Sequence, residues 1–190
     1  GLPVGHPLRE GARKLIEICA RTCGRLNQML ETFLQVSRLE SGMMPVRPET
    51  VELKPLVQAC LEEQAVTVRC KSITLDVVLP EGLRVRADRG LLSRVVQNLL
   101  NNALKFTPDK ERITVSAAAG EDGGSVLLRV RDTGPGIPRA DLPHIFDRFY
   151  QVRGAGERKG TGLGLAFCRQ ATAAMGGDII VESAPRLGTE

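Results

Sequence analysis

The chain has 190 residues, enough for one compact domain of about 140 to 150 residues and an appended element. With 42% hydrophobic and 25% charged residues, it has the composition of an ordinary globular protein, which excludes a disordered, collagen-like or membrane-embedded chain. The basic residues behind the net charge of +4 are spread along the sequence, and 5 Phe, 1 Tyr and no Trp accompany them, so we expect no nucleic-acid partner.

The first predicted element is a long helix from Arg9 to about Glu40. It contains no proline, and its apolar or small residues recur at alternating steps of three and four, as in helices that pack on other helices. These residues are Ala12, Leu15, Cys19, Thr22, Leu26, Met29, Phe33 and Val36. Because only eight residues precede this rod of roughly 45 Å, we expect a second copy or sequence outside this chain to cover the stripe. Gly42 is suited to end the helix.

The start of the chain and its cysteines indicate a reducing compartment. Residues 1–8 carry neither the basic start nor the apolar block of a secretory signal, and no apolar run approaches the ~20 residues of a bilayer crossing. The five cysteines lack a C-x-x-C pair, which predicts neither a disulfide framework nor a zinc site. We therefore expect a cytoplasmic protein with reduced core cysteines, attached to a membrane, if at all, through other parts of a longer parent.

Beyond a linker marked by Pro45 and Pro48, extended and helical patterns alternate. The predicted strands are 51–53, 73–79, 83–87, 112–119, 125–130 and 178–182. The predicted helices are 55–69, 88–104 with Asp88 as its N-cap, and 164–175. This order predicts an α/β fold with a mixed sheet and helices on one of its faces.

Three polar side chains form a row on the helix after Asp88. Asn98, Asn102 and Lys105 are spaced i, i+4 and i+7, which places two amides and an ammonium along one face. Amide carbonyls can complete the oxygen shell of Mg²⁺, which keeps substrate phosphates as other ligands, and a lysine can meet a phosphate directly. The alternative is an ordinary solvated helix face.

Glycine marks a second candidate region. Of the 20 glycines, 13 lie between residues 120 and 190, and five crowd into residues 154–164. Backbone amides of a glycine-rich loop that leads into a helix can cradle phosphate oxygens. The order of residues 159–164 matches neither a P-loop nor G-x-G-x-x-G, so the sequence predicts a nucleotide site of another type.

Four segments, taken together, resemble the N, G1, F and G2 boxes of the sensor histidine kinases of two-component systems, in the right order. They are residues 98–108, 132–138, 146–150 and 160–165. Residues 33–42 also resemble the end of the second helix of that family's dimerisation domain. The resemblance implies a partial dimerisation domain at 1–42 and a catalytic ATP-binding domain at 43–190. The implied fold is a Bergerat-type α/β sandwich, shared with gyrase-like, mismatch-repair and chaperone ATPases.

The resemblance also implies roles for individual residues. Asp132 would accept a hydrogen bond from the adenine amino group, Asn102 would coordinate Mg²⁺, and Arg148 would approach the γ-phosphate together with the catalytic residues Asn98 and Lys105. Phe106 stands at a position usually held by tyrosine. The implied ATP contacts are Asn98, Asn102, Lys105, Phe106, Asp132, Gly134, Gly136, Ile137, Phe149, Lys159, Gly160, Thr161, Gly162, Leu163, Gly164 and Leu165. Gly188 and Thr189 resemble the last glycine box, without the strand that usually follows it.

The stretch between Gly136 and Gly160 corresponds to the family's ATP lid. Phe146 and Phe149 are expected to anchor the lid to the core, and His144 is expected to be structural. Three cationic side chains there could lie over the triphosphate, although solvated side chains are the alternative. They are Arg153, Arg158 and Lys159.

His6 departs from the family's phosphoacceptor motif, because proline follows it where an acidic residue belongs. We therefore expect His6 to lie in a loop and the true phosphoacceptor to lie upstream of this chain. The resemblance implies a kinase whose parent is a homodimer and which passes the phosphoryl group to a response-regulator receiver domain. The alternatives are a non-catalytic module in which ATP regulates a partner, and a degenerate scaffold.

Overall fold

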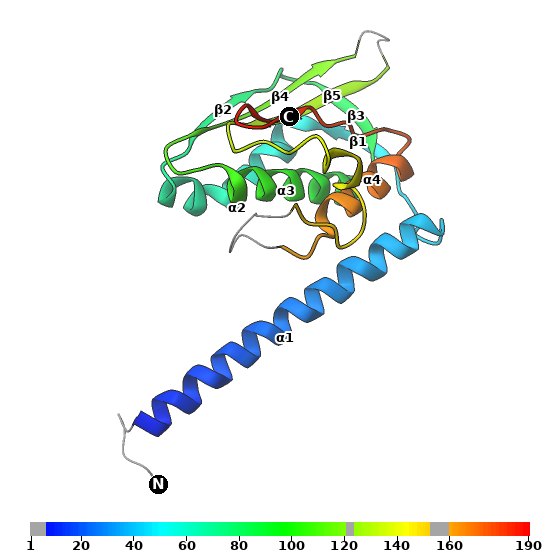
Figure 1. The fold of residues 1–190 in the computed structure, drawn as a ribbon. Coiled ribbons are helices and arrows are strands. Elements are labelled where there is room, and N and C mark those ends of the chain that lie inside the picture. Colours follow the sequence, from blue (N-terminus) through cyan, green and yellow to red (C-terminus); the bar gives the residue numbers. More distant parts are fainter. Residues whose placement is uncertain (1–6, 121–123, 153–159) are drawn as a thin grey trace.

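The computed structural model describes residues 7–120, 124–152 and 160–190 of the chain. The helices are α1 (Pro7–Glu40), α2 (Leu53–Cys70), α3 (Arg89–Phe106) and α4 (Gly164–Ala174), with one 3₁₀ turn, η1 (Leu142–His144). The strands are β1 (Glu49–Glu52), β2 (Thr74–Val78), β3 (Arg84–Ala87), β4 (Arg112–Ala119), β5 (Val126–Asp132), β6 (Ser183–Ala184) and β7 (Gly188–Thr189). Figure 1 shows the sheet as one layer, with α2, α3 and α4 below it and α1 extending away.

The main sheet has five strands in the order β2-β4-β5-β7-β6. The β2–β4 pair is parallel and the other pairs are antiparallel, so the sheet is mixed as expected. Strands β1 and β3 form a separate antiparallel pair, in which Val51 lies opposite Val85. The last strand, β7, enters between β5 and β6, with Thr189 opposite Asp132.

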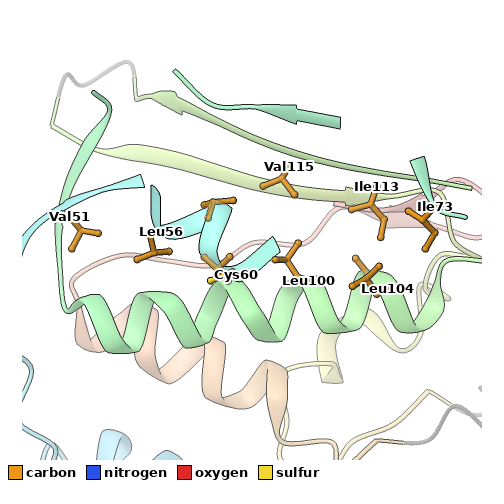
Figure 2. Close-up of a cluster of buried hydrophobic side chains, with 11 residues drawn as sticks. Val51, Leu56, Cys60, Ile73, Leu100, Leu104, Ile113 and Val115 are labelled. Carbon is orange, nitrogen blue, oxygen red and sulfur yellow. The ribbon is translucent and has the colours of Figure 1, made fainter. Parts of the chain in front are cut away.

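A first hydrophobic core fills the space between the sheet and helices α2 and α3. Figure 2 shows its side chains between α3 and the strands. The cluster consists of Val51, Leu56, Val57, Cys60, Ile73, Val96, Leu100, Ala103, Leu104, Ile113 and Val115. The alternating burial of β4 explains why its inner residues reach this core while its other face stays accessible. The two-layer α/β sandwich predicted from the sequence is confirmed.

A side chain fixes each end of α3: Asp88, directly before the helix, and Lys71, directly after α2. The carboxylate of Asp88 accepts a hydrogen bond from the backbone N–H of Leu91 at 3.0 Å, as expected for an N-cap. Its second oxygen accepts from the N–H of Arg47 at 3.0 Å, which ties the linker after α1 to the start of α3. At the other end, Lys71 Nζ donates to the carbonyl of Leu104 at 2.6 Å and neutralises part of the helix's negative pole.

Among the described residues, helix α1 contacts the rest of the molecule through its C-terminal half. The stripe residues from Ala12 to Leu26 are exposed, whereas Val36 and Leu39 are buried in a second cluster with side chains of α3 and α4. The predicted stripe is thus partly covered by this chain's own helices, which the sequence pattern did not indicate. Within the described residues, no helix is both long and apolar enough to cross a membrane.

Two other expectations need correction. Residues 178–182 form no strand, because Glu182 alone in that stretch exchanges backbone hydrogen bonds with Glu190, and Ile180 is 70% exposed. The strand pairing begins only at Ser183, in β6. The cysteines are not all core residues either. Cys60 and Cys168 are buried, while the other three are exposed: Cys19, Cys23 and Cys70.

Candidate functional site

The site is built along one face of α3. The amide row, as we call Asn98, Asn102 and Lys105, lies on this helix, and all three side chains are partly buried. Asn98 Nδ2 donates to the backbone carbonyl of Arg94 at 3.0 Å. Because that bond occupies the amino group, the carbonyl oxygen of Asn98 faces away from its own helix turn. Partial burial lowers the pKa of Lys105 by desolvating the ammonium.

The glycine loop, residues 160–164, runs alongside the amide row and leads into α4. A Cβ placed on Gly164 would lie 3.1 Å from Asn98 Oδ1, and one placed on Gly160 would lie 3.0 Å from Lys105 Nζ. Both ends of the loop therefore approach the row so closely that side chains would crowd it. The structure thus brings together two regions that the sequence identified separately, 55 or more residues apart in the chain.

A buried carboxylate closes one end of this surface. Asp132 ends β5 with only 9% of its surface exposed, and its Oδ1 accepts the backbone N–H of Gly134 at 2.7 Å. Desolvation raises the pKa of Asp132, and backbone hydrogen bonds from Gly134 and Thr189 oppose that rise. A carboxylate held by two backbone donors keeps a fixed orientation and can accept a further hydrogen bond from a ligand.

The loop after Asp132 packs tightly on its neighbours. A Cβ on Gly134 would lie 3.3 Å from the carbonyl oxygen of Phe106, which joins this loop to the end of α3. Gly136 has φ +70°, and a Cβ there would lie 2.0 Å from the carbonyl oxygen of Ala184. Ile137 donates its backbone N–H to Ser183 Oγ at 2.9 Å. Close approach to the backbone of Phe106 and Ala184 thus favours glycine at both positions, and the predicted approach of this loop to adenine stays a prediction.

This geometry, a buried carboxylate, an amide row and a glycine loop around one helix, agrees with a family match. Residues 87–190, just over half of the chain, match the family described as histidine kinase-, DNA gyrase B-, and HSP90-like ATPases. The chain belongs to this ATPase family. Within the family, it is the catalytic ATP-binding portion of a sensor histidine kinase, as its relatives show.

Three relatives define this placement. The signal transduction histidine-protein kinase AfsQ2 of Streptomyces coelicolor is 34% identical over 183 residues, which cover 96% of this chain and 32% of AfsQ2. The mycobacterial sensor histidine kinase MprB has a solved structure with TM-score 0.64 and 31% identity, covering 75% of this chain and 93% of that one. Full-length ShkA in complex with AMPPNP gives TM-score 0.80 and 28% identity, covering 93% and 37%. The chain spans less than half the length of the curated relatives it matches.

Two predicted site residues of the kinase domain turn toward α1. Arg148 pairs with Glu40 at the end of α1, with Nε donating to Oε1 at 3.1 Å. The Phe149 ring stacks on Phe33 of α1 with 5.9 Å between ring centroids. Phe149 is 47% exposed and anchors its segment to α1, not to the core of the domain as expected. Their proposed contacts with ATP stay predictions.

The remaining predicted residues of the kinase domain are placed as follows. Phe106 lies beneath Lys105 Nζ, 4.7 Å from its ring centroid. The side chain of Leu163 is fully buried, so this residue contributes only its backbone to the surface of the glycine loop. Thr161 is exposed, and its Oγ1 accepts a hydrogen bond from the Leu163 N–H at 3.3 Å. Leu165 is partly buried in the first turn of α4. Arg153, Arg158, Lys159 and His6 lie outside the described residues.

Three further residues support the site and had no role in the sequence prediction. Ser183 Oγ accepts from Ile137 and donates to the Gly188 carbonyl at 2.8 Å, so it joins the loop after Asp132 to β7. The guanidinium carbon of Arg94 lies 4.3 Å from the centroid of the Phe167 ring. Arg94 Nη2 also donates to Thr32 Oγ1 at 2.9 Å, and this hydrogen bond links α3 to α1. Glu40 holds Arg148. Only Glu40 lay in a segment that the family resemblance had singled out.

The side-chain oxygens available at the site suit a divalent cation that is bound mainly through the phosphates of a nucleotide. Among the described residues, no group of three His, Cys, Asp or Glu side chains could hold a metal. The amide row instead offers neutral carbonyl oxygens, and the bond from Asn98 to Arg94 leaves the Asn98 oxygen directed at the glycine loop. Mg²⁺ typically takes one or two protein oxygens and completes its shell with waters and substrate phosphates. The residues present fit that ion.

Proposed function

We propose that the chain transfers the γ-phosphoryl group of ATP to a histidine nitrogen of a dimerisation helix, for relay to an aspartate of a response-regulator receiver domain. The observation that carries this proposal is the approach of the glycine loop to the amide row on α3. The buried Asp132 ends β5, and the loop that follows it packs on the C-terminal end of α3. Phosphoryl transfer depends on positioning and charge neutralisation more than on covalent help from the protein. A site of amides, glycines and one lysine supplies these two contributions.

The two ends of the site would hold the two ends of ATP. Asp132 accepts a hydrogen bond from the adenine amino group, which selects against guanine because guanine presents a carbonyl at that position. Lys105 and the amides of the glycine loop meet the phosphates, near the N-terminus of α4. The bond from Pγ to its bridging oxygen breaks as the histidine nitrogen bonds to Pγ, and ADP leaves with the electron pair.

Asn102, with Asn98 beside it, would hold Mg²⁺ against the phosphates. When bound, the ion neutralises charge that develops on the phosphate oxygens during transfer. These two side chains would hold the ion next to Lys105 and the glycine loop.

Replacing Asn102 by alanine should reduce the Mg²⁺-dependent part of ATP affinity by about 10- to 100-fold, the loss typical when support for a metal site is removed. The helix should stay intact, because alanine is the better helix former by roughly 0.5 to 0.7 kcal/mol. Calorimetric titrations with and without Mg²⁺ measure the effect. The control is Asn101→Ala, at the exposed neighbouring position. An unchanged Mg²⁺ dependence, or an unfolded variant, would show that the row is structural.

The phosphoacceptor belongs to a different helix from α1. The 34 residues of α1 span about 50 Å, so its N-terminal end lies far from the C-terminal half that contacts α4. We therefore assign α1 the role of the second dimerisation helix and expect the acceptor histidine on a partner helix in a homodimeric parent. This chain would bind ATP, whereas the acceptor histidine would lie on another polypeptide. The function is therefore tested by phosphoryl transfer from this chain to a second protein.

In that assay, the chain is incubated with γ-labelled ATP, Mg²⁺ and a second protein that carries a helical hairpin with an intact histidine motif. We expect acid-labile label on the second protein and none on the chain itself. Lys105→Ala should reduce the transfer, because it removes the cation next to Gly160. His6→Ala serves as the matched control and should change nothing.

The same assay separates the kinase from the alternatives. A nucleotide-regulated module or a scaffold would bind ATP without labelling any acceptor. Label on the chain that disappears in His6→Ala would instead show that the phosphoacceptor has been misplaced.

A further inference from the structure

One short segment of the kinase domain is held from both sides. Residues 145–150, the turn segment, follow η1 and carry Arg148 and Phe149. On one side, these two residues contact α1 through Glu40 and Phe33. On the other side, Phe149 donates its backbone N–H to the Gly162 carbonyl at 2.9 Å. The turn segment therefore connects the end of α1 directly to the glycine loop (Figure 1).

The contact with the glycine loop is close. Phe149 has φ +64°, a left-handed conformation that a bulky residue adopts only when its surroundings impose it. Gly162 has φ +71°, and a Cβ there would lie 2.5 Å from the carbonyl carbon of Phe149. The two backbones therefore lie in direct contact, with no room between them for a side chain at residue 162.

The contact with α1 uses the donors of Arg148 that a phosphate would need. Arg148 Nε donates to one carboxylate oxygen of Glu40 at 3.1 Å, and Nη2 pairs with the other oxygen. This is the two-pronged geometry by which a guanidinium also grips a phosphate. The guanidinium also lies over the Phe33 ring, 5.6 Å from its centroid. With this edge of the fork on Glu40, Arg148 cannot present it to a nucleotide.

We propose that Glu40 is a latch that competes with the γ-phosphate of ATP for Arg148, so that the position of α1 sets the preference for ATP over ADP. The inference rests on the proposed function and on the prediction from the family resemblance that Arg148 approaches the γ-phosphate. While the Glu40–Arg148 pair is closed, the site binds ADP as well as before, but ATP lacks one cationic contact. A movement of α1 that separates the pair releases the arginine and strengthens ATP binding.

The strength of the Glu40–Arg148 pair limits how much it can change the affinity for ATP. Each side chain of the pair is about one third exposed, which screens the attraction. Closing the latch lowers the fraction of molecules whose arginine is available, and the apparent affinity for ATP falls by that fraction. A partly exposed pair of this kind supports a change of roughly two- to five-fold.

The test measures the dissociation constants of AMPPNP and ADP, both with Mg²⁺, for the whole chain. Glu40→Gln keeps the shape of the side chain and removes its charge. It should tighten AMPPNP binding by roughly two- to five-fold and leave ADP binding unchanged. Glu17→Gln is the matched control, because Glu17 lies on the same helix in an ion pair with Arg13 at 3.0 Å. It should change neither constant.

A second variant separates the latch from a general effect of charge. Arg148→Gln should weaken AMPPNP alone, and adding Glu40→Gln to it should have no further effect. Thermal melts establish that each variant is folded. The latch is overturned if Glu40→Gln leaves the AMPPNP-to-ADP ratio unchanged, weakens AMPPNP binding, or acts equally without Arg148. Failure of the unmodified chain to bind ADP would overturn the proposed function itself, so the two failures are distinguishable.

Discussion

Replacing Asp132 by asparagine is expected to weaken ATP binding by roughly 5- to 150-fold and to abolish any preference for ATP over GTP. The structural reason is that Asp132 is buried and held by backbone donors from Gly134 and Thr189. An asparagine there presents an amino group toward the amino group of adenine and leaves a buried donor without a partner, at a cost of about 1 to 3 kcal/mol. Calorimetric titration of ATP and GTP measures both effects.

A control separates adenine recognition from a loss of charge. Asp109→Asn removes one carboxylate at a position whose side chain is 69% exposed, and it should leave both affinities unchanged. Equal affinities of the unmodified chain for ATP and GTP would contradict the assignment of Asp132, whatever the variants do.

Gly136→Ala should produce the second large effect, a loss of about 2 to 5 kcal/mol in the free energy of unfolding together with loss of nucleotide binding. The left-handed backbone of Gly136 accounts for part of this, and the rest comes from overlap with the Ala184 carbonyl oxygen, 2.0 Å from the added Cβ. Relief of the overlap must move either the loop after Asp132 or the end of β6. Urea unfolding and ADP titration measure the two losses.

Gly82→Ala is a matched control, because Gly82 has almost the same φ, +68°, but no atom within 4 Å of the added Cβ. It should cost about 1 to 2 kcal/mol through backbone strain alone and leave ADP binding intact. Equal losses in the two variants would mean that close packing at Gly136 contributes nothing.

The elements with a strong local signal were predicted well. Strand β4 has the predicted bounds, and Asp88 caps α3 as expected, because alternation, helical periodicity and capping are properties of neighbouring residues. The amide row was visible for the same reason. Its closeness to the glycine loop followed from the family resemblance, not from any local pattern.

The contacts that were not predicted depend on residues far apart in the chain. Glu40 and Arg148 are 108 residues apart, and the neighbouring Phe149 adopts a left-handed conformation that is rare for a residue other than glycine. Residues 178–182 have the apolar character of a strand but find a pairing partner only at Glu182. The boundary at residue 42 and the nucleotide contacts stay predictions.

The insertion of β7 between β5 and β6 has a consequence for how the protein is made. Asp132 acquires its hydrogen bond from Thr189 only when that residue is available to pair with β5. During synthesis, the chain through α4 can bury most of both hydrophobic clusters while Asp132 still lacks that hydrogen bond. If Asp132 contacts adenine as proposed, full ATP affinity develops only after residue 189 has been made and paired. ATP would then stabilise late folding intermediates and not the early collapse.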